Sequence, residues 1–271
     1  MSKTYMRNWI VVLTILWMTG RAMGVAAQND FCSTGNKCVQ AGEKLNFKVY
    51  YNLSAIWVAA GEANFTTKQE SLNGKPVFHI TGEGATYTSY DWIFRVRDKY
   101  ETYVDVETLL PLKFIRNVDE GGYKFTNNVT FDQEQRKAYS NKKTFDVPKC
   151  VQDVLSTIYY ARNIDYSKYK PGAKIPFSMF LDDQVYNLYI RYVGKEKVKT
   201  KYGTFNAIKI APLLIKGTIF EGGEKMTVWV SDDDNHIPVR VDSPILVGSI
   251  KVDMMGYSNL RYPLSSLIKK R

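Results

Sequence analysis

Side chains that could carry acid–base, nucleophilic or metal chemistry are scarce in this sequence. Its 271 residues include only two histidines, His79 and His236, and three cysteines. Neither histidine lies near a cysteine in sequence, and the short motifs of serine hydrolases, zinc proteases and phosphate-binding loops are missing. Two histidines and one aspartate could ligate a metal, but structural histidines are commoner. We therefore predict no catalytic residue, no metal site and no cofactor.

Carboxylates are the remaining candidates for chemistry. The densest acidic stretch is Asp232 to Asn235. A calcium loop needs alternating acids, a turn glycine and a distal glutamate, which this stretch lacks, so a polar turn between strands explains it better. Glycoside hydrolysis needs two carboxylates across a cleft. Glu83, Asp91, Asp98 and Glu101 supply the number, but the sequence does not say whether any two share a cleft.

Aromatic side chains are the more informative group and make up 14% of the chain. An aromatic residue at strand spacing packs into a core by default. An open curved sheet, however, cannot fill its own interior and leaves part of its concave apolar face uncovered. We predict an apolar groove on that face. Its expected lining includes Trp57, Trp92, Phe94 and Trp229.

The elements that must position these side chains are mostly strands. Segments between residues 42 and 254 alternate apolar and polar residues with period two, most clearly over 123–131. Such a period is typical of a sheet with one solvated face. Asn73-Gly74 and Gly121-Gly122 mark hairpin turns. The pattern predicts ten to twelve strands.

One segment departs from this period. Apolar residues from Cys150 to Arg162 fall at helical spacing. We predict a helix over about Cys150–Asn163 that packs on the sheet through Val154, Leu155 and Ile158. The predicted fold class is mainly β: a large antiparallel curved sheet, half-barrel or barrel, with one packed α-helix. A single β-rich domain over residues 28–271 is expected.

The first 27 residues have the composition of a secretory leader. Lys3 and Arg7 precede an apolar run of ten residues, Trp9 to Met18, and small residues precede Gln28. Ten apolar residues are about half of what a bilayer span needs. We predict cleavage after Ala27 and an exported chain, periplasmic or extracellular, with no transmembrane segment. Cys32 does not stand at the cleavage point, so a lipoprotein is not expected.

The chain carries a net positive charge. It is +10 overall and +7 without the three bases of residues 1–27, since 34 basic residues then face 27 acidic ones. The bases are spread along the chain. The alternating lysines from Lys195 to Lys201 are typical of one solvated strand face. We expect no nucleic-acid partner; the charge favours solubility or a weak attraction to anionic envelope surfaces.

The cysteines allow one disulfide in an oxidising compartment and leave one thiol over. Cys32 and Cys38 enclose five residues and precede the first strand, so their loop closes easily. Pairing of Cys38 with Cys150 would instead tie the amino-terminal segment to the helix start. We predict the Cys32–Cys38 disulfide, with Cys150 as the odd thiol.

Several phrases of the sequence occur in an order that resembles a known family. They include Gly42-Glu43-Lys44-Leu45, Ala60-Gly61-Glu62-Ala63, Arg95-Val96-Arg97-Asp98, Asp153-Val154-Leu155-Ser156, Tyr159-Tyr160-Ala161-Arg162 and Trp229-Val230-Ser231-Asp232. Over about residues 40 to 255 the chain resembles domain of unknown function 3108, a bacterial family of exported proteins. The resemblance implies no enzyme activity and no catalytic residue. The family's β-rich architecture is similar to lipoprotein-carrier (LolA-like) half-barrels, which is a likeness of fold.

Two hypotheses of different classes follow. The first is a non-catalytic exported envelope protein that binds a lipid-like or other apolar ligand, or a partner protein. The second is a secreted hydrolase that acts on polysaccharide or envelope glycan. The lack of catalytic motifs favours the first. A dry apolar groove would support it, whereas two inward carboxylates across a wet cleft would support the second.

Overall fold

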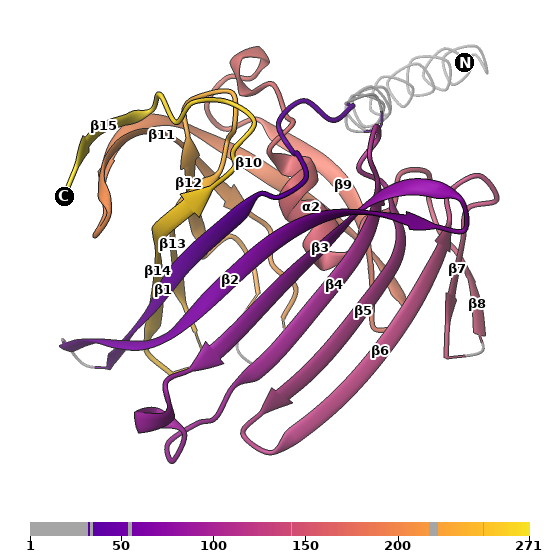
Figure 1. The fold of residues 1–271 in the computed structure, drawn as a ribbon, viewed down its shortest axis with the longest axis horizontal. Helices are drawn as coiled ribbons and strands as arrows, with labels where there is room; N and C mark the ends of the chain where they lie inside the picture. Colours follow the sequence, from indigo (N-terminus) through magenta and orange to yellow (C-terminus); the bar gives the residue numbers. More distant parts are fainter. Residues whose placement is uncertain (1–31, 33–34, 54–55, 142, 217–221, 246) are drawn as a thin grey trace, which may run out of the picture.

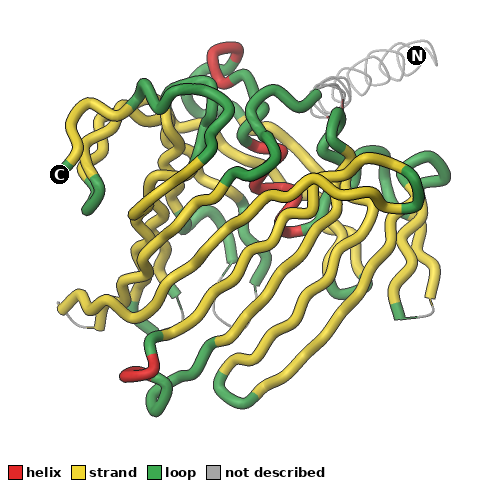
Figure 2. The backbone as a smooth tube through the Cα atoms, in the orientation of Figure 1, coloured by secondary structure: helices red, strands yellow, loops and turns green. Residues whose placement is uncertain are grey.

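The computed structural model describes residues 32, 35–53, 56–141, 143–216, 222–245 and 247–271, and strands dominate it (Figures 1 and 2). The predicted leader, residues 1–27, and its cleavage point lie outside the described residues. The strands are β1 (Lys44–Leu53), β2 (Ile56–Leu72), β3 (Lys75–Thr86), β4 (Arg97–Asp105), β5 (Pro111–Glu120), β6 (Tyr123–Asp132), β7 (Lys137–Ser140), β8 (Lys143–Asp146), β9 (Lys174–Leu181), β10 (Gln184–Lys199), β11 (Gly203–Pro212), β12 (Thr227–Ser231), β13 (Pro238–Pro244), β14 (Ser249–Ser258) and β15 (Leu267–Lys270). The helices are η1 (Thr88–Tyr90), α2 (Val154–Ala161) and η2 (Tyr166–Lys168).

All fifteen strands belong to one curved antiparallel sheet that is not closed into a barrel. Its order is β8-β7-β6-β5-β4-β3-β2-β1-β14-β13-β12-β11-β10-β9, and β15 pairs with β11. The two edge strands approach through side chains: the ring of Phe180 in β9 lies 5.4 Å from that of Phe145 in β8 and 6.1 Å from that of Phe131 in β6. The predicted fold class is confirmed as an open, barrel-like sheet with a packed helix.

The two ends of the sheet differ in what they carry. Because neighbouring strands run antiparallel, the β1–β2, β3–β4, β5–β6 and β13–β14 connections all lie at one end, which is the lower end in Figure 1. The β2–β3, β4–β5 and β12–β13 connections lie at the opposite, upper end. Helix α2 lies within the curve of the sheet and contacts β4 and β9.

Helix α2 begins at Val154 because Asp153 caps it. The Asp153 carboxylate accepts from the amides of Leu155 and Ser156 at 2.8 and 2.7 Å, and the Ser156 hydroxyl accepts from the Asp153 amide, which completes a capping box. Thr102 in β4 also donates to Asp153, at 2.6 Å. The predicted start at Cys150 was wrong, because the preceding residues pair with β9 through the Gln152–Met179 bridge instead.

The buried face of α2 differs in part from the prediction. Leu155 is 2% exposed and Val154 packs against the main core, as predicted. Ile158 is 37% exposed, so its predicted place in the core was wrong. Tyr159 and Tyr160 are buried instead, and these larger side chains fill the space between helix and sheet. No helix among the described residues has the length and apolar character to cross a membrane.

A buried ion pair joins three parts of the chain at the upper end. The Arg162 guanidinium, at the end of α2, donates to both carboxylate oxygens of Glu43, at 2.6 and 2.8 Å. Arg162 Nε donates to the carbonyl of Asn235 in the β12–β13 connection, at 3.0 Å. Both charged side chains are at most 2% exposed. A buried ion pair is stable only if nearly all of its polar atoms have hydrogen-bond partners. The contacts with Glu43 and with the Asn235 carbonyl supply such partners for the Arg162 guanidinium.

The disulfide joins Cys32 to Cys150, with a Cα–Cα distance of 5.6 Å, so the predicted Cys32–Cys38 pairing was wrong. Cys38 is a free thiol and is 1% exposed. Asn36 bonds to the Val39 backbone through both of its side-chain amide atoms, and this turn directs Cys38 into the core. Burial raises the pKa of the Cys38 thiol.

The ion pair can be tested by Glu43→Gln. Glutamine leaves the buried Arg162 charge without a compensating anion, so the free energy of unfolding should fall by about 3–5 kcal/mol in chemical denaturation. The matched control is Asp146→Asn. That carboxylate is 90% exposed where it pairs with Lys137, and its loss should cost less than about 1 kcal/mol. Equal effects of the two changes would contradict the role given to Glu43.

The disulfide can be tested by denaturation with and without a reductant. Cys32 and Cys150 are separated by 118 positions in sequence. Opening a loop of this length should lower the free energy of unfolding by about 4 kcal/mol, and a Cys38→Ala variant should keep the full effect of the reductant. A Cys32–Cys38 peptide after non-reducing digestion would overturn the assignment.

Candidate functional site

Large apolar side chains are exposed mainly at the lower end of the sheet. Of the thirteen large hydrophobic residues that are exposed in the described part of the chain, seven lie there. They are Ile56 and Trp57 at the β1–β2 connection, Trp92, Ile93 and Phe94 at β3–β4, Tyr123 at β5–β6, and Val247 at β13–β14. These connections are consecutive along the sheet, and we call the seven residues the apolar rim. Large apolar groups exposed at neighbouring tips of one end of a sheet are candidates for an interaction site.

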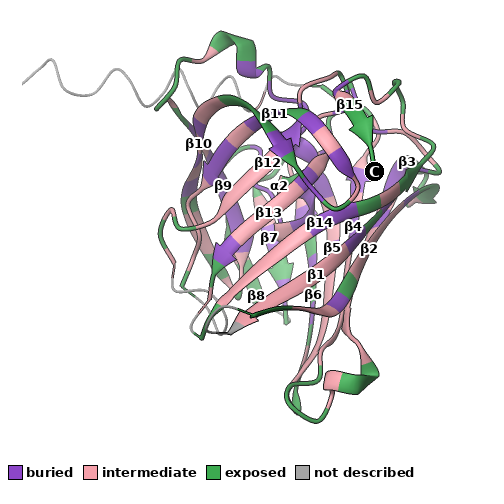
Figure 3. Ribbon diagram, turned by 90° about the vertical axis from the view of Figure 1, so that its left-hand side faces the viewer, coloured by how far each residue is buried: buried purple, intermediate pink, exposed green. Residues whose placement is uncertain are grey.

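The β3–β4 loop carries the most exposed part of the rim. Trp92 is 83% exposed, Ile93 63% and Phe94 47%. The loop contains the short helix η1 and lies at the bottom of the molecule in Figure 3, and the neighbouring β5–β6 hairpin reaches about as far down in Figure 1. Three consecutive large apolar residues at such a tip carry no benefit for the core, because none of them reaches it.

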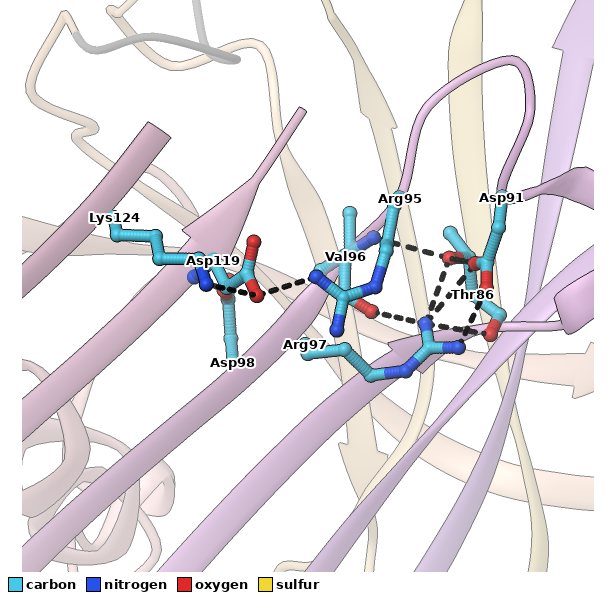
Figure 4. A network of polar contacts seen from close by, with 8 residues as sticks. All are labelled: Thr86, Asp91, Arg95, Val96, Arg97, Asp98, Asp119 and Lys124. Atoms are coloured by element: carbon cyan, nitrogen blue, oxygen red, sulfur yellow. Dashed lines mark hydrogen bonds and ion pairs between the residues drawn. The ribbon is translucent and has the colours of Figure 1, made fainter. Parts of the chain in front are cut away.

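A polar network beneath this loop fixes its shape (Figure 4). Arg97 in β4 donates to both carboxylate oxygens of Asp91, at 2.8 and 3.1 Å, and to the carbonyl of Thr86. The Thr86 hydroxyl donates to Asp91 at 2.7 Å and accepts from the amide of Val96. The hydrogen bonds from Thr86 and Arg97 hold the pKa of Asp91 below its ordinary value. The two ends of the loop are thus tied together, and Trp92 and Ile93 are presented by an ordered turn.

A second set of contacts joins this loop to the β5–β6 connection. Arg95 pairs with Asp119, and the Gly121 amide donates to the carbonyl of Arg95 at 2.8 Å. The ring of Phe94 lies against Gly121, where a Cβ would stand only 2.6 Å from a ring carbon. Gly121 also has a φ of +58°, so glycine is required there on both counts. Two neighbouring tips of the rim are therefore held as one unit.

The rim continues across β1 and β14. Lys251 Nζ lies 4.3 Å from the ring centroid of Trp57, which is 42% exposed. The Tyr51 hydroxyl donates to the carbonyl of Val247 at 3.1 Å and so fixes the β13–β14 turn against β1. A lysine over a tryptophan ring combines a cation with an apolar surface.

The four aromatic residues expected to line a concave groove do not share one. Trp57 pairs in register with Asn52, on the face opposite to the one that holds α2, and Trp92 and Phe94 lie in the β3–β4 loop. Trp229 in β12 lies apart from them and donates through its indole nitrogen to Glu196 at 2.6 Å. The structure thus brings three of the four to one rim, and that rim is at the end of the sheet.

The sequence did not point to Ile56, Ile93, Tyr123 and Val247 as members of the site. The available signal was the run Trp92-Ile93-Phe94, which falls between two strands where polar turn residues are the rule. Whether such a run reaches the core depends on which way the loop turns, and the Arg97–Asp91 contact decides this.

One perturbed carboxyl pair lies on the side of the sheet that holds α2. Burial, together with a hydrogen bond to Asp98 and its negative charge, raises the pKa of Glu120 to about 7. Arg116 nearby pairs with Asp182, and its guanidinium carbon lies 4.8 Å from the ring centroid of Phe125. The pair can hold or release a proton near neutral pH.

The other candidate groups have structural partners. Glu101 accepts from His79 and Lys99, both at 3.1 Å, and His236 bonds to the carbonyl of Arg162 at 2.7 Å. Asp233 accepts from the Asn235 amide, as expected for a polar turn. A hollow of about 290 Å³ on β2–β4 is lined by charges of both signs, including Glu83. Among the described residues, no three histidine, cysteine, aspartate or glutamate side chains are grouped to hold a metal ion.

Comparison with known proteins places this chain by family and fold. The family described as "Protein of unknown function (DUF3108)" matches residues 46–255. No curated protein sequence matches. A solved β-barrel-like protein of domain of unknown function DUF1849 from Brucella abortus is 9% identical, covers 82% of this chain and 98% of its own, and gives a TM-score of 0.52. At that identity the likeness concerns the fold alone.

Two further solved structures are more distant. One is described as a candidate lipoprotein from Parabacteroides distasonis: it is 12% identical, covers 81% of this chain and 96% of its own, and gives a TM-score of 0.34. The other is a protein of YmcC-like fold from Bacteroides fragilis: it is 11% identical, covers 81% and 97%, and gives a TM-score of 0.32. Both superpose too poorly to inform the arrangement of this chain.

The Glu120–Asp98 pair predicts a pH dependence of stability. The pKa of Glu120 rises from an ordinary value of 4.5 to about 7 in the folded chain. Between these values the folded protein holds a proton that the unfolded chain releases, so stability falls as the pH rises through this window. Glu120→Gln stays neutral and should show a smaller difference in Tm between pH 5 and pH 8 than the wild type.

The comparison isolates Glu120 because other shifted groups are common to both proteins. Burial raises the pKa of Asp153 to about 6, which contributes in the same direction in each. An identical dependence on pH in variant and wild type would show that Glu120 ionises normally in the folded protein.

Proposed function

The chain belongs to the DUF3108 family, and we propose that it is a non-catalytic binding protein of the cell envelope whose apolar rim engages a lipid-like ligand or a partner protein. The observation that carries the proposal is the cluster of exposed apolar side chains on four consecutive connections of the sheet. Exposed apolar side chains lower the solubility of a protein. A bound ligand or partner that covers these residues explains why the chain has them at its surface.

The rigidity of the β3–β4 loop supports the same function. Binding costs less conformational entropy when the contacting groups are already ordered. Asp91 is held by both Thr86 and Arg97, and the rest of the loop is anchored by Arg95 to Asp119. A loop that only connected two strands would need none of these contacts, and its tip would be expected to carry polar residues.

The leader-like composition of residues 1–27 supports placement in the envelope. A basic start, an apolar run and a small-residue exit are typical of exported chains. The Cys32–Cys150 disulfide fits an oxidising compartment outside the cytoplasm.

The hydrolase hypothesis has two observations in its favour: the raised pKa of Glu120, and the hollow on β2–β4 that Glu62 and Glu83 line together with the bases Arg97 and Lys99. A general acid near neutral pH needs such a shift. Glycoside hydrolysis, however, needs carboxyls separated by about 5 Å or more, to admit a sugar or a water. Glu120 and Asp98 are hydrogen-bonded to each other, which leaves no such space. Binding without catalysis is therefore the better supported function.

Site-specific photocrosslinking in cells of the native host tests the proposal. A photoreactive amino acid in place of Ile93, which is 63% exposed on the rim, should give adducts with a lipid or a protein. The matched control is the same replacement of Ile268, which is 50% exposed on β15, outside the rim. Adducts at neither position, or equally at both, would contradict a binding role for the rim.

A further inference from the structure

We infer that the counterpart of the apolar rim is the surface of an anionic lipid bilayer, on which the protein docks peripherally through its hairpin tips. The inference rests on the proposed binding function of the rim and names its occupant. Its first basis is composition. Tryptophan, tyrosine, phenylalanine and isoleucine make up six of the seven rim residues, and aromatic rings with one polar edge favour the boundary between lipid headgroups and acyl chains.

The charges next to the rim complement an anionic surface. Lys251 lies over Trp57 with its Nζ 4.3 Å from the ring centroid, so the cation and the ring face the same side. Lys124, beside Tyr123, has a side chain that is 76% exposed, and that of Arg95, beside Phe94, is 46% exposed. Long basic side chains beside apolar anchors reach lipid phosphates while the anchors enter the headgroup layer.

The carboxylates of the same connections do not oppose such contact. Asp91 pairs with Arg97, whereas Asp119 has two basic neighbours, Arg95 and Lys124, whose Nζ lies 3.9 Å away, so the bases at this tip exceed that carboxylate by one charge. Burial raises the pKa of Glu120 to about 7, which keeps part of this carboxyl neutral near neutral pH. Between β13 and β14 the described residues Ile245, Val247 and Gly248 carry no charge. Lys124 and Lys251 add positive charge beside the rim, in keeping with the net charge of the chain as a whole, +10.

The distribution of the apolar groups favours a fluid surface over a folded protein. The seven side chains stand at four separate connections along one end of the sheet, of which β3–β4 and β5–β6 reach furthest down in Figure 1. A stable protein interface needs a continuous, shape-complementary patch with a well-packed centre. Separate hairpin tips do not form such a patch. Lipid headgroups can rearrange around each tip, so a bilayer needs no surface of complementary shape.

Vesicle sedimentation tests the inference with the full chain. The probes are vesicles of phosphatidylcholine alone and of phosphatidylcholine with phosphatidylglycerol. The wild type should partition onto the anionic vesicles, and less so as the salt concentration rises. Trp92→Ser with Ile93→Ser should weaken partitioning by about tenfold or more, because two exposed apolar anchors are lost. Ile268→Ser, a matched exposed isoleucine outside the rim, should bind like the wild type.

Two further controls concern the role of charge in vesicle binding and the contribution of residues 1–27. Lys124→Glu should weaken binding to the anionic vesicles and leave the weak binding to phosphatidylcholine alone unchanged. Any affinity of residues 1–27 is common to every variant, so it cannot produce a difference between them. The altered side chains are exposed, and unchanged melting temperatures would show that each variant is folded.

Three results would overturn the inference: no partitioning of the wild type, equal partitioning onto the two kinds of vesicle, or binding that the Trp92 and Ile93 changes leave intact. The crosslinking experiment decides the proposed function independently of vesicle binding. Protein adducts from position 93 without any vesicle binding would keep a binding role for the rim and replace the bilayer by a protein partner. No adducts at that position would remove the binding role itself.

Discussion

The buried pair of Glu43 and Arg162 is the interaction on which the arrangement of this molecule depends. A charge that is at most 2% exposed is tolerated only if its partner is fixed and its remaining donors are satisfied. Arg162 meets this condition through Glu43 and the Asn235 carbonyl. These groups belong to the entry of β1, the end of α2 and the β12–β13 connection. One charge therefore sets where the helix lies within the curve of the sheet.

Fixing the helix near the upper end gives the two ends of the sheet opposite characters. At the upper end, Glu43 and Arg162 are buried and paired. At the start of α2, the buried Thr102 hydroxyl likewise donates a hydrogen bond to the buried Asp153 carboxylate. At the lower end the polar contacts of Thr86, Asp91 and Arg97 support the β3–β4 loop (Figure 4), and Trp92 and Ile93 in that loop are 83% and 63% exposed. An ordinary soluble domain would have the reverse arrangement at its hairpin tips. This difference between the two ends is the basis on which we propose the lower end as the binding surface.

The open sheet explains why such an end can persist. A closed barrel of this many strands would enclose a cavity, whereas this sheet is left open between β8 and β9 and is bridged there by packing of Phe180 on Phe145. The core is then completed by α2 and by large tyrosines such as Tyr159 and Tyr160. The exposed rim residues at the hairpin tips lie outside this core.

The sequence by itself determined the class of fold, because period-two alternation and hairpin dipeptides such as Asn73-Gly74 act over a few residues and need no distant partner. It also determined that one helix packs through Leu155, since helical spacing is equally local. Only the tertiary structure decided the Cys32–Cys150 pairing, the pairing of Glu43 with Arg162 and the outward direction of Trp92. Each of these depends on which segments the sheet order brings together across a hundred residues or on how a loop is tied at its base. A local pattern of residue types contains no information about such long-range placement.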